Sequence, residues 1–450
     1  MSMTYRIRPP RARLSRRAAL LLPLAATGCS LFDKWFGDKK VPLEGKRVGL
    51  AVAKRGLEID NPPDRKIALP PPEAVPDSPQ AGGTPSHVVG HVAARDTLAE
   101  AWRAGIGQGG GYRRKITAQP VVAGGHVFAM DSDAVVSAFD FSTGGQLWRV
   151  PTSNPDDDST NIGGGIGFDG GTVYAANGLA NVVALDAASG KQRWKINLPT
   201  AARSAPTIAE GRLYIATLDD QVLALSAADG SRVWAYQAPA TDTSVLGLPA
   251  PAFAEGLVVA GFGGGDLACL RTGTGAVNWT DSLASVAGRA SLVDLSAIHG
   301  MPAIVEGRVY AAGIGGLLVS LDLRSGRRLW ERDIGSDQTP RVAGDWMFVV
   351  TTDQVMVALN RLDGTIAWVT QLPRWQDEEQ QTDPIRWLGP ALAGDRLIVA
   401  GSDSEALAVS PYTGKILGRQ PLSGAASVAP VAVDGTVLVV TDDGNLLALR

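Results

Sequence analysis

The chain has few of the residue types from which catalytic and metal-binding sites are built. Its 450 residues include two cysteines, Cys29 and Cys269, and four histidines. No serine, histidine and acid group stands in a recognisable local context, so general-base catalysis has few candidates. Aromatic residues make up only 6% of the chain, whereas 53 residues are glycine, which argues against a mainly helical protein. The composition favours a β-rich binding scaffold over an enzyme.

Acidic residues are missing from the first 28 positions, which hold six arginines. Removing these arginines from the 42 basic residues of the chain leaves 36 against 45 acidic residues, a net charge of −9. This balance argues against nucleic acid as a partner, because phosphate binding needs concentrated positive charge. The arginines precede the apolar run AALLLPLAA at residues 18–26, which is too short to span a bilayer. Residues 1–28 are therefore expected to be an export signal.

The end of this signal, LAATGC at residues 24–29, resembles a bacterial lipobox, in which the cysteine is diacylated and becomes the mature N-terminus. Ala26 stands where leucine is usual, and an ordinary signal peptide with a coincidental cysteine is the alternative. Residues 15–20 (SRRAAL) also resemble a twin-arginine signal, so the secretion route, Sec or Tat, stays open. We expect Cys29 to carry the lipid, and Ser30, by not being aspartate, to favour transport to the outer membrane.

Residues 29–96 do not show the repeat described below and are rich in proline, which predicts a lipidated N-terminal tether. Once Cys29 is lipidated, Cys269 has no partner for a disulfide. It replaces a small alanine of the repeat, which predicts a buried core position.

A β-hairpin motif recurs along the rest of the chain. In residues 181–194 (NVVALDAASGKQRW) a strand runs to Asp186, a turn with Gly190 reverses the chain, and a second strand carries Trp194. Copies of this hairpin recur about every 45 residues, a period typical of repeated structural units. A seventh copy has Gly418 in place of the tryptophan. The turn glycines are Gly144, Gly190, Gly230, Gly275, Gly326, Gly364 and Gly414.

Each hairpin is preceded by a further short apolar segment and strand, as in residues 206–216, so that each unit holds about four strands. Sheets of this size bury both faces by stacking radially around an axis. The last unit stops at Arg450 without a fourth strand, whereas residues 98–104 form a strand without partners one repeat before Trp148. We predict that these two ends pair.

The sequence thus predicts an all-β fold for residues 97–450, an eight-bladed β-propeller of four-stranded antiparallel blades closed by the N- and C-terminal strands. Seven blades is the alternative if the unit without tryptophan is degenerate.

The motif Ala184-x-Asp186-x-x-Ser189-Gly190-Lys191-x-x-Trp194 resembles the tryptophan-docking repeat of pyrroloquinoline quinone (PQQ) dehydrogenases, which also occurs in propellers that bind no quinone. With the lipobox, the number of repeats and the ending at residues 430–450, the chain is similar to the BamB family, the lipoprotein subunit of the outer-membrane β-barrel assembly machine. The resemblance implies that tryptophans dock neighbouring blades: Trp102, Trp148, Trp194, Trp234, Trp279, Trp330 and Trp368.

The same resemblance implies a function. It predicts a non-catalytic scaffold without cofactor or metal, held by its lipid at the periplasmic face of the outer membrane. Such a scaffold binds the barrel-inserting subunit BamA and assists the folding and insertion of outer-membrane proteins.

Two connections between predicted blades are longer and more apolar than the repeat requires, at residues 243–248 and 281–300. In the BamB family these loops bind the periplasmic domains of BamA, and Asp294 falls on an acidic position of the family. Other family acids correspond to Ala297 and His299, and a basic position corresponds to Leu246. We therefore expect a more apolar contact, the alternative being that these side chains only pack on the blades. The expected contact residues are Val245, Leu246, Leu292, Asp294, Leu295, Ile298 and His299.

Other hypotheses stay open at the level of sequence. A quinoprotein dehydrogenase needs a divalent ion held by carboxylate and amide groups and commonly two adjacent cysteines, which this chain lacks. A periplasmic glycan or peptide binder could stack ligands on Trp375 and Trp387. These tryptophans lie in a polar insert at residues 372–390, which is either a solvated loop or a second contact. His87 and His91 are four residues apart, but without a third ligand they do not predict a metal site.

Overall fold

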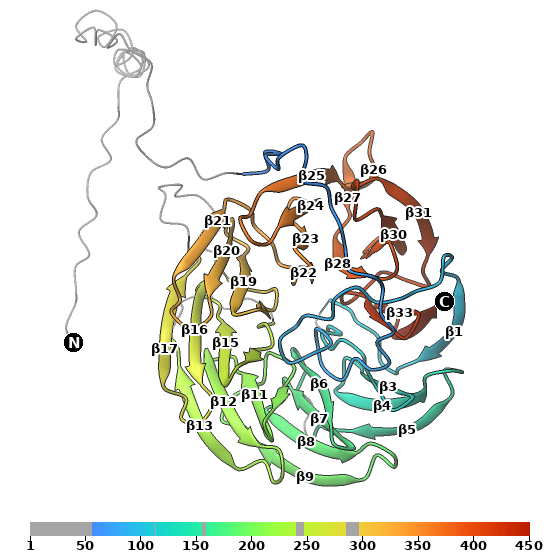
Figure 1. The fold of residues 1–450 in the computed structure, drawn as a ribbon. Helices are drawn as coiled ribbons and strands as arrows, with labels where there is room; N and C mark the ends of the chain where they lie inside the picture. Colours follow the sequence, from blue (N-terminus) through green and yellow to red (C-terminus); the bar gives the residue numbers. More distant parts are fainter. Residues whose placement is uncertain (1–55, 113, 155–158, 240–246, 285–296) are drawn as a thin grey trace, which may run out of the picture. The chain divides into compact units, whose positions relative to one another are not determined.

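The computed structural model describes residues 56–112, 114–154, 159–239, 247–284 and 297–450, and in these ranges the chain forms strands and no helix. Eight four-stranded antiparallel sheets stand as blades around a central axis (Figure 1). The predicted eight-bladed propeller is confirmed, and the seven-bladed alternative is wrong. The insert before blade seven carries a separate pair of strands, β26 (Trp375–Asp377) and β27 (Thr382–Pro384).

Blades one to seven each consist of four consecutive strands, ordered from the axis to the rim. Blades one to three comprise β2 (Val121–Ala123), β3 (His126–Met130), β4 (Val135–Asp140) and β5 (Gln146–Pro151); β6 (Gly164–Asp169), β7 (Thr172–Asn177), β8 (Asn181–Asp186) and β9 (Gln192–Asn197); and β10 (Thr207–Ala209), β11 (Arg212–Ala216), β12 (Gln221–Ser226) and β13 (Arg232–Gln237). Blades four and five comprise β14 (Ala252–Ala254), β15 (Leu257–Gly261), β16 (Asp266–Arg271) and β17 (Val277–Ser282); and β18 (Ala303–Val305), β19 (Arg308–Gly313), β20 (Leu317–Asp322) and β21 (Arg328–Arg332). Blades six and seven comprise β22 (Arg341–Ala343), β23 (Trp346–Val350), β24 (Val355–Asn360) and β25 (Ile366–Gln371); and β28 (Trp387–Leu392), β29 (Leu397–Gly401), β30 (Glu405–Val409) and β31 (Ile416–Pro421).

Blade eight joins the two ends of the chain, as predicted. It contains β32 (Val431–Val433), β33 (Thr436–Val440), β34 (Asn445–Leu449) and, as its outer strand, β1 (Glu100–Gly105). β1 pairs antiparallel with β34, and Trp102 lies opposite Ala448. The C-terminal strand therefore has neighbours on both sides, which removes two open sheet edges.

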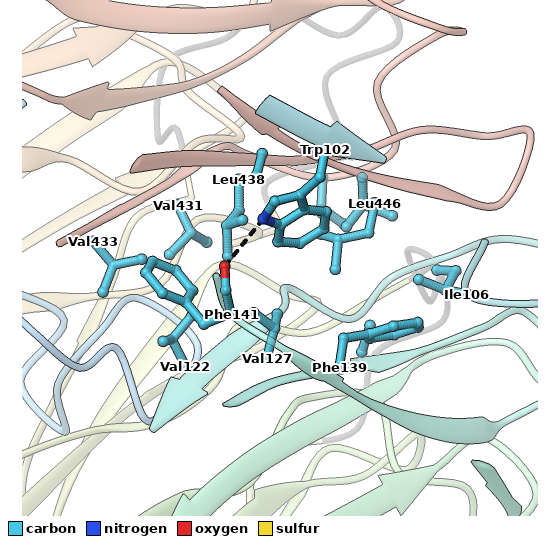
Figure 2. Close-up of a cluster of buried hydrophobic side chains, with 14 of the residues drawn as sticks. Trp102, Ile106, Val122, Val127, Phe139, Phe141, Val431, Val433, Leu438 and Leu446 are labelled. Carbon is cyan, nitrogen blue, oxygen red and sulfur yellow. Dashed lines mark hydrogen bonds between the residues drawn. The ribbon is translucent and has the colours of Figure 1, made fainter. Parts of the chain in front are cut away.

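Tryptophans of the outer strands contact the next blade at seven junctions. In Figure 2 the indole Nε1 of Trp102 donates to the carbonyl of Phe141 in blade one at 3.0 Å, beside the side chains of β33 and β34. Six further indoles donate to main-chain carbonyls of the following blade: Trp148 to Ala187, Trp194 to Ala227, Trp234 to Thr272, Trp279 to Leu323, Trp330 to Arg361 and Trp368 to Pro411.

The turn glycine of the next blade lies against each of these indoles. Gly326 has a φ of 71°, in the left-handed region, and a Cβ atom built there would lie 2.6 Å from Trp279. The glycine is therefore required twice, for the backbone conformation and for the close approach of the ring.

The apolar cores lie between neighbouring blades. Phe128 and Val136 of blade one pack in one cluster with Ile166 and Val183 of blade two, and all four are almost fully buried. Full burial of side chains of this size stabilises a fold by roughly 1.5–3 kcal/mol each. Cys269 lies in the equivalent cluster between blades four and five, as expected, and burial raises the pKa of its thiol to about 12.

Residues 56–96, which we call the clasp, differ from the expected tether. They pack on the propeller and belong to the same compact unit. The clasp forms hydrogen bonds with the innermost strand or first turn of seven blades, and it crosses the middle of the ring as the blue segment of Figure 1. These bonds join Ser78 to Val122, Pro79 to Phe168, Gln80 to Ile208, Pro85 to Phe253, Ser86 to Ile304, Val92 to Gly394 and Val75 to Asp434.

The clasp reaches blade six at the rim. The guanidinium of Arg332, whose side chain is only 2% exposed, donates to both carboxylate oxygens of Asp60 at 2.6 and 2.7 Å. Asp60 also accepts the N–H of Ile366 at 2.8 Å. A buried arginine that loses its carboxylate costs roughly 3–5 kcal/mol, so this ion pair fixes the start of the clasp.

The prolines and glycines of the clasp suit a segment that contacts many blades in succession. Pro79 and Pro85 present carbonyls to blades two and four and have no N–H of their own to satisfy. Gly82 and Gly83 have φ values of 74° and 89°, which allows the tight turn at the axis. The composition that predicts an N-terminal tether is therefore also compatible with an ordered segment that packs on the propeller.

Candidate functional site

The connections between blades open on one face of the propeller, which we call the loop face. Each connection runs from the outer strand of one blade to the innermost strand of the next. The opposite face, the turn face, carries the clasp, whose Val75 and Ala94 contact the first turn of blade eight at Asp434 and Gly435. A partner can therefore reach the inter-blade connections without displacing the clasp.

Two connections on the loop face contain the predicted partner-contact residues. The described residues stop at 239 and 284 and resume at 247 and 297. Outside them lie five of the predicted residues: Val245, Leu246, Leu292, Asp294 and Leu295.

The blades fix both ends of these connections. The N–H of Leu248 donates to the carbonyl of Arg203 at 3.1 Å, and the N–H of Leu283 donates to the carbonyl of Gly265 at 2.7 Å. The two connections therefore begin and end at defined points on blades three to five. Cys29 also lies outside the described residues.

Ile298 is not available for the contact that we expected of it. Its side chain is fully buried in the cluster between blades four and five, and its N–H donates to the carbonyl of Phe262 at 3.1 Å. The residue also forms an isolated bridge with Gly313. The prediction of a direct partner contact is wrong for this residue, because its apolar side chain closes the junction of the two blades.

His299 lies at the mouth of the central channel. It is half-buried, and its Nδ1 is 3.4 Å from the carbonyl oxygen of Asp337. The carboxylate of Asp337 forms an ion pair with Arg386 at 2.6 Å. His299 is thus on the loop face beside the second connection, where a partner contact remains a prediction.

The channel opens on the loop face as a funnel of about 420 Å³. Its walls are the segments that precede the innermost strands, and they combine small apolar residues such as Ala205 and Ala250 with Ser204 and Gln119. Ala81 of the clasp also lines it. The clasp thereby closes the channel at the turn face, and the funnel is blind.

Burial lowers the pKa of two basic groups, one in the clasp and one that lies against it. Burial lowers the pKa of His87 to about 4, although its Nδ1 is 2.7 Å from the carbonyl oxygen of Pro302, so the imidazole is neutral at neutral pH. Burial also lowers the pKa of Arg341 to about 10, which leaves its guanidinium charged at neutral pH. His91 contacts carbonyl oxygens of Pro70 and Gly394. Through these contacts the two histidines join the clasp to blades five and seven.

The geometry gives no support to a quinone and metal centre. The described ranges contain no group of three His, Cys, Asp or Glu side chains that could hold a metal ion. Asp337 and Asp442, the carboxylates of the funnel, are engaged with Arg386 and with the Ser427 hydroxyl at 2.6 and 2.7 Å.

The insert before blade seven separates the two tryptophans that we considered for ligand stacking. Trp387 is fully buried at the start of β28, and its Nε1 donates to the carbonyl of Pro373 at 2.7 Å. Its predicted exposure is wrong, because it packs with blade six. Trp375 is half-buried, and the guanidinium of Arg374 lies over its ring at 6.0 Å from the centroid. The pair therefore offers no common stacking surface.

Sequence reasoning missed the clasp and the funnel floor. The contacts of Gln80 with Ile208 join residues that are 128 positions apart and follow no periodic pattern. The available signal was compositional: the glycine pair Gly82–Gly83 lies among prolines and marks a position where the chain turns tightly.

Comparison with known families and proteins gives a consistent result. The family model for "Outer membrane protein assembly factor BamB" matches residues 88–158, 132–370 and 373–450. Proteins of that name from Yersinia pestis and from Burkholderia pseudomallei are each 27% identical to this chain, over 356 and 359 residues. These alignments cover 77% and 78% of this chain and 87% of each relative. Residues 56–87 of the clasp lie outside the family match.

Solved structures share the fold. The crystal structure of BamB from Moraxella catarrhalis superposes with a TM-score of 0.66 at 22% identity and covers 78% of this chain and 99% of that one. A quinohemoprotein alcohol dehydrogenase from Pseudomonas putida superposes with a TM-score of 0.65 at 13% identity and covers 83% of this chain and 80% of that one. Likeness at these identities shows the propeller and assigns no reaction. No helix in the described ranges has the length and apolar character needed to cross a bilayer.

Proposed function

We propose, on the premise that this chain belongs to the BamB family of outer membrane protein assembly factors, that it is a non-catalytic, lipid-anchored scaffold of the β-barrel assembly machine. It binds the periplasmic part of the barrel-inserting subunit BamA through the inter-blade connections of the loop face. In this way it assists the folding and insertion of outer-membrane proteins. It works at the periplasmic face of the outer membrane.

The division between the two faces is the observation that carries this proposal. The clasp covers the turn face, whereas the connections at residues 239–247 and 284–297 begin and end on the loop face with fixed ends. A rigid ring that presents two neighbouring connections from blades three to five suits a binding surface, because little conformational entropy is lost in the blades when a partner binds.

The start of the clasp suits a lipid anchor at Cys29. Asp60 is fixed at the junction of blades five and six by Arg332 of β21 and by the N–H of Ile366. The roughly 30 residues between Cys29 and Asp60 span at most about 100 Å when fully extended. This reach allows the propeller to bind a periplasmic domain while its N-terminus stays in the membrane. The Cys29→Ser variant should therefore leave the membrane fraction and keep its thermal melting temperature.

Replacement of Leu246 by glutamate tests the partner surface. A carboxylate buried against an apolar partner side chain loses its hydration, so we expect Leu246→Glu to reduce co-purification of BamA from solubilised membranes by at least tenfold. Leu417→Glu is the matched control, because Leu417 is an apolar side chain that is 53% exposed on blade seven, away from these connections. Undiminished recovery of BamA with Leu246→Glu, or an equal loss with Leu417→Glu, contradicts the proposed surface.

A further inference from the structure

Among the described residues, the lining of the funnel holds more basic than acidic side chains. The guanidinium of Arg203 lines its wall and donates to the carbonyl of Ile162, while its buried Nε has no hydrogen-bond partner among the described residues. Burial lowers the pKa of the Arg203 guanidinium. Lys115 lines the same funnel. A buried guanidinium nitrogen without an acceptor is unfavourable, so an anionic acceptor at this place would stabilise the site.

The acids of the described lining balance only part of this charge. Asp337 is paired with Arg386, so these two groups balance each other. Asp442 accepts the hydroxyl of Ser427 and is the remaining carboxylate of the lining. The described part of the lining therefore holds three basic side chains, Lys115, Arg203 and Arg386, against two carboxylates, which leaves an excess of one positive charge.

A further cation lies beyond the funnel floor. Arg341 lines a void of about 10 Å³, the space of one water molecule, together with Gly82 and Gly83 of the clasp. Its Nε donates to the carbonyl of Pro390 at 3.2 Å, and no ion pair of Arg341 is found in the described ranges. Gln119 lines both the void and the funnel. The clasp thus forms a floor with positive charge on either side of it.

The size and walls of the funnel define the kind of ligand. A volume of about 420 Å³ lies within the range of roughly 300–1,000 Å³ that is typical of small-molecule sites. Carbon surfaces of Ala250, Met301 and Val428 face the same space as the cations. An ion such as phosphate would leave most of this surface unused.

We propose that the blind funnel is a binding site for a small organic anion, whose carboxylate pairs with Arg203 and Lys115 and whose apolar part packs against the alanine, valine and methionine side chains of the wall. The clasp contributes Ala81 to the lining of this site. Its walls include the ends of the two inter-blade connections at Leu248 and His299. Its test measures binding of a small ligand to the isolated chain, so its failure can be told apart from a failure of the partner surface proposed above.

Isothermal titration of the full mature chain with benzoate tests this site. We expect saturable binding of benzoate, and at least tenfold weaker binding of benzamide, which has the same shape without the charge. Arg203→Gln should weaken benzoate binding at least tenfold, and Arg203→Lys should restore part of it. Arg193→Gln is the matched control, because Arg193 pairs with Asp186 on the rim and should leave benzoate affinity unchanged.

Lys115→Gln gives a second measurement that does not depend on the buried arginine, because Lys115 is exposed and its replacement does not disturb the core. We expect at least a threefold loss of affinity. Absence of saturable benzoate binding by the wild-type chain overturns the site. So does equal binding of benzamide, or affinity that is unchanged in both Arg203→Gln and Lys115→Gln. Inorganic phosphate that binds as tightly as benzoate overturns the role of the apolar wall.

Discussion

The junction between blades seven and eight is built differently from the other seven. At those seven, an indole of the outer strand contacts the turn glycine of the next blade. In blade seven Gly418 lies opposite Ala408, in the register where Trp368 lies opposite Ala358 in blade six. Blade eight has no turn between its third and outer strands, because β34 ends at the C-terminus and β1 begins near the N-terminus.

An indole in blade seven would have no turn glycine to contact, so the missing tryptophan follows from where the ring is closed. The inner parts of these two blades pack as elsewhere, with Ile398 and Leu449 in one cluster. At its junction with blade one, blade eight forms an additional contact. The guanidinium of Arg450 lies over the ring of Phe141 at 5.1 Å from the centroid and donates to its carbonyl at 2.6 Å.

Removal of residues 441–450 would break the closing blade and should have the largest effect. The deletion takes away β34, which lies between β33 and β1 and carries the fully buried Leu446 and Leu447. We expect loss of soluble protein or of cooperative unfolding, measured by thermal melting with circular dichroism. An unchanged melting temperature of the truncated protein would show that the ends do not close the ring.

Replacement of Trp279 by alanine would break one of the seven docked junctions. The indole is 8% exposed and donates to the carbonyl of Leu323 at 2.7 Å. We expect the free energy of unfolding to fall by about 3–5 kcal/mol, measured by urea denaturation. Gly418→Ala at the undocked junction is the control, because a Cβ atom there meets nothing within 4 Å. Its effect should stay within about 0.5 kcal/mol; equal costs for the two variants would refute the distinction between the junctions.

A pair of glycine substitutions separates the docking contact from the backbone conformation. Gly326 and Gly307 have φ values of 71° and 70°, but only at Gly326 would a Cβ atom meet an indole, that of Trp279. Gly307→Ala should cost about 1 kcal/mol of unfolding free energy through backbone strain alone. Gly326→Ala should cost about 2–4 kcal/mol, because the clash with the ring adds to this strain. Calorimetric unfolding of both variants measures the difference, and similar costs would assign the glycine to the turn only.

The smallest effect on the melting temperature is expected from the carboxylates at the turn between the third and fourth strands. Some blades have this carboxylate and others lack it. Donors from Arg193 and Ser189 lower the pKa of Asp186 from 3.8 to about 2, whereas blade seven has Ser410 at the matching position. A carboxylate with a lowered pKa stabilises the fold above its unfolded pKa, and this contribution is lost as the pH falls toward 2. The melting temperature of the wild type should exceed that of Asp186→Asn at pH 7, and the gap should shrink between about pH 4 and pH 2. A gap that does not change with pH would contradict the role of the charge.

The repeat was predictable because its determinants are local. A turn glycine and a tryptophan a few residues later, as in Gly190 and Trp194, fix a hairpin within one short segment. The pairing of β1 with β34 was predictable because each end lacked a complementary strand. The clasp was not predictable, since Asp60 and Gln80 find their partners about 270 and 128 residues away.

Local reasoning also misplaced single side chains. Ile298 and Trp387 lie in inserts that the repeat does not require, and an apolar residue in an insert can either face a partner or extend the core of its own blade. Burial decides between these two roles, and in both residues it favours the core. Arg203 carries no sequence signal at all, because its significance depends on the channel that eight blades form together.

The clasp imposes an order of events on the folding of a newly synthesised chain. It leaves the ribosome near the beginning of synthesis, yet Val75 and Val92 find their hydrogen-bond partners only when blades seven and eight exist, at the opposite end of the polypeptide. The clasp must therefore stay without these partners until the last strands have been synthesised. Circular permutation that places the clasp directly after blade eight in the sequence would remove this delay.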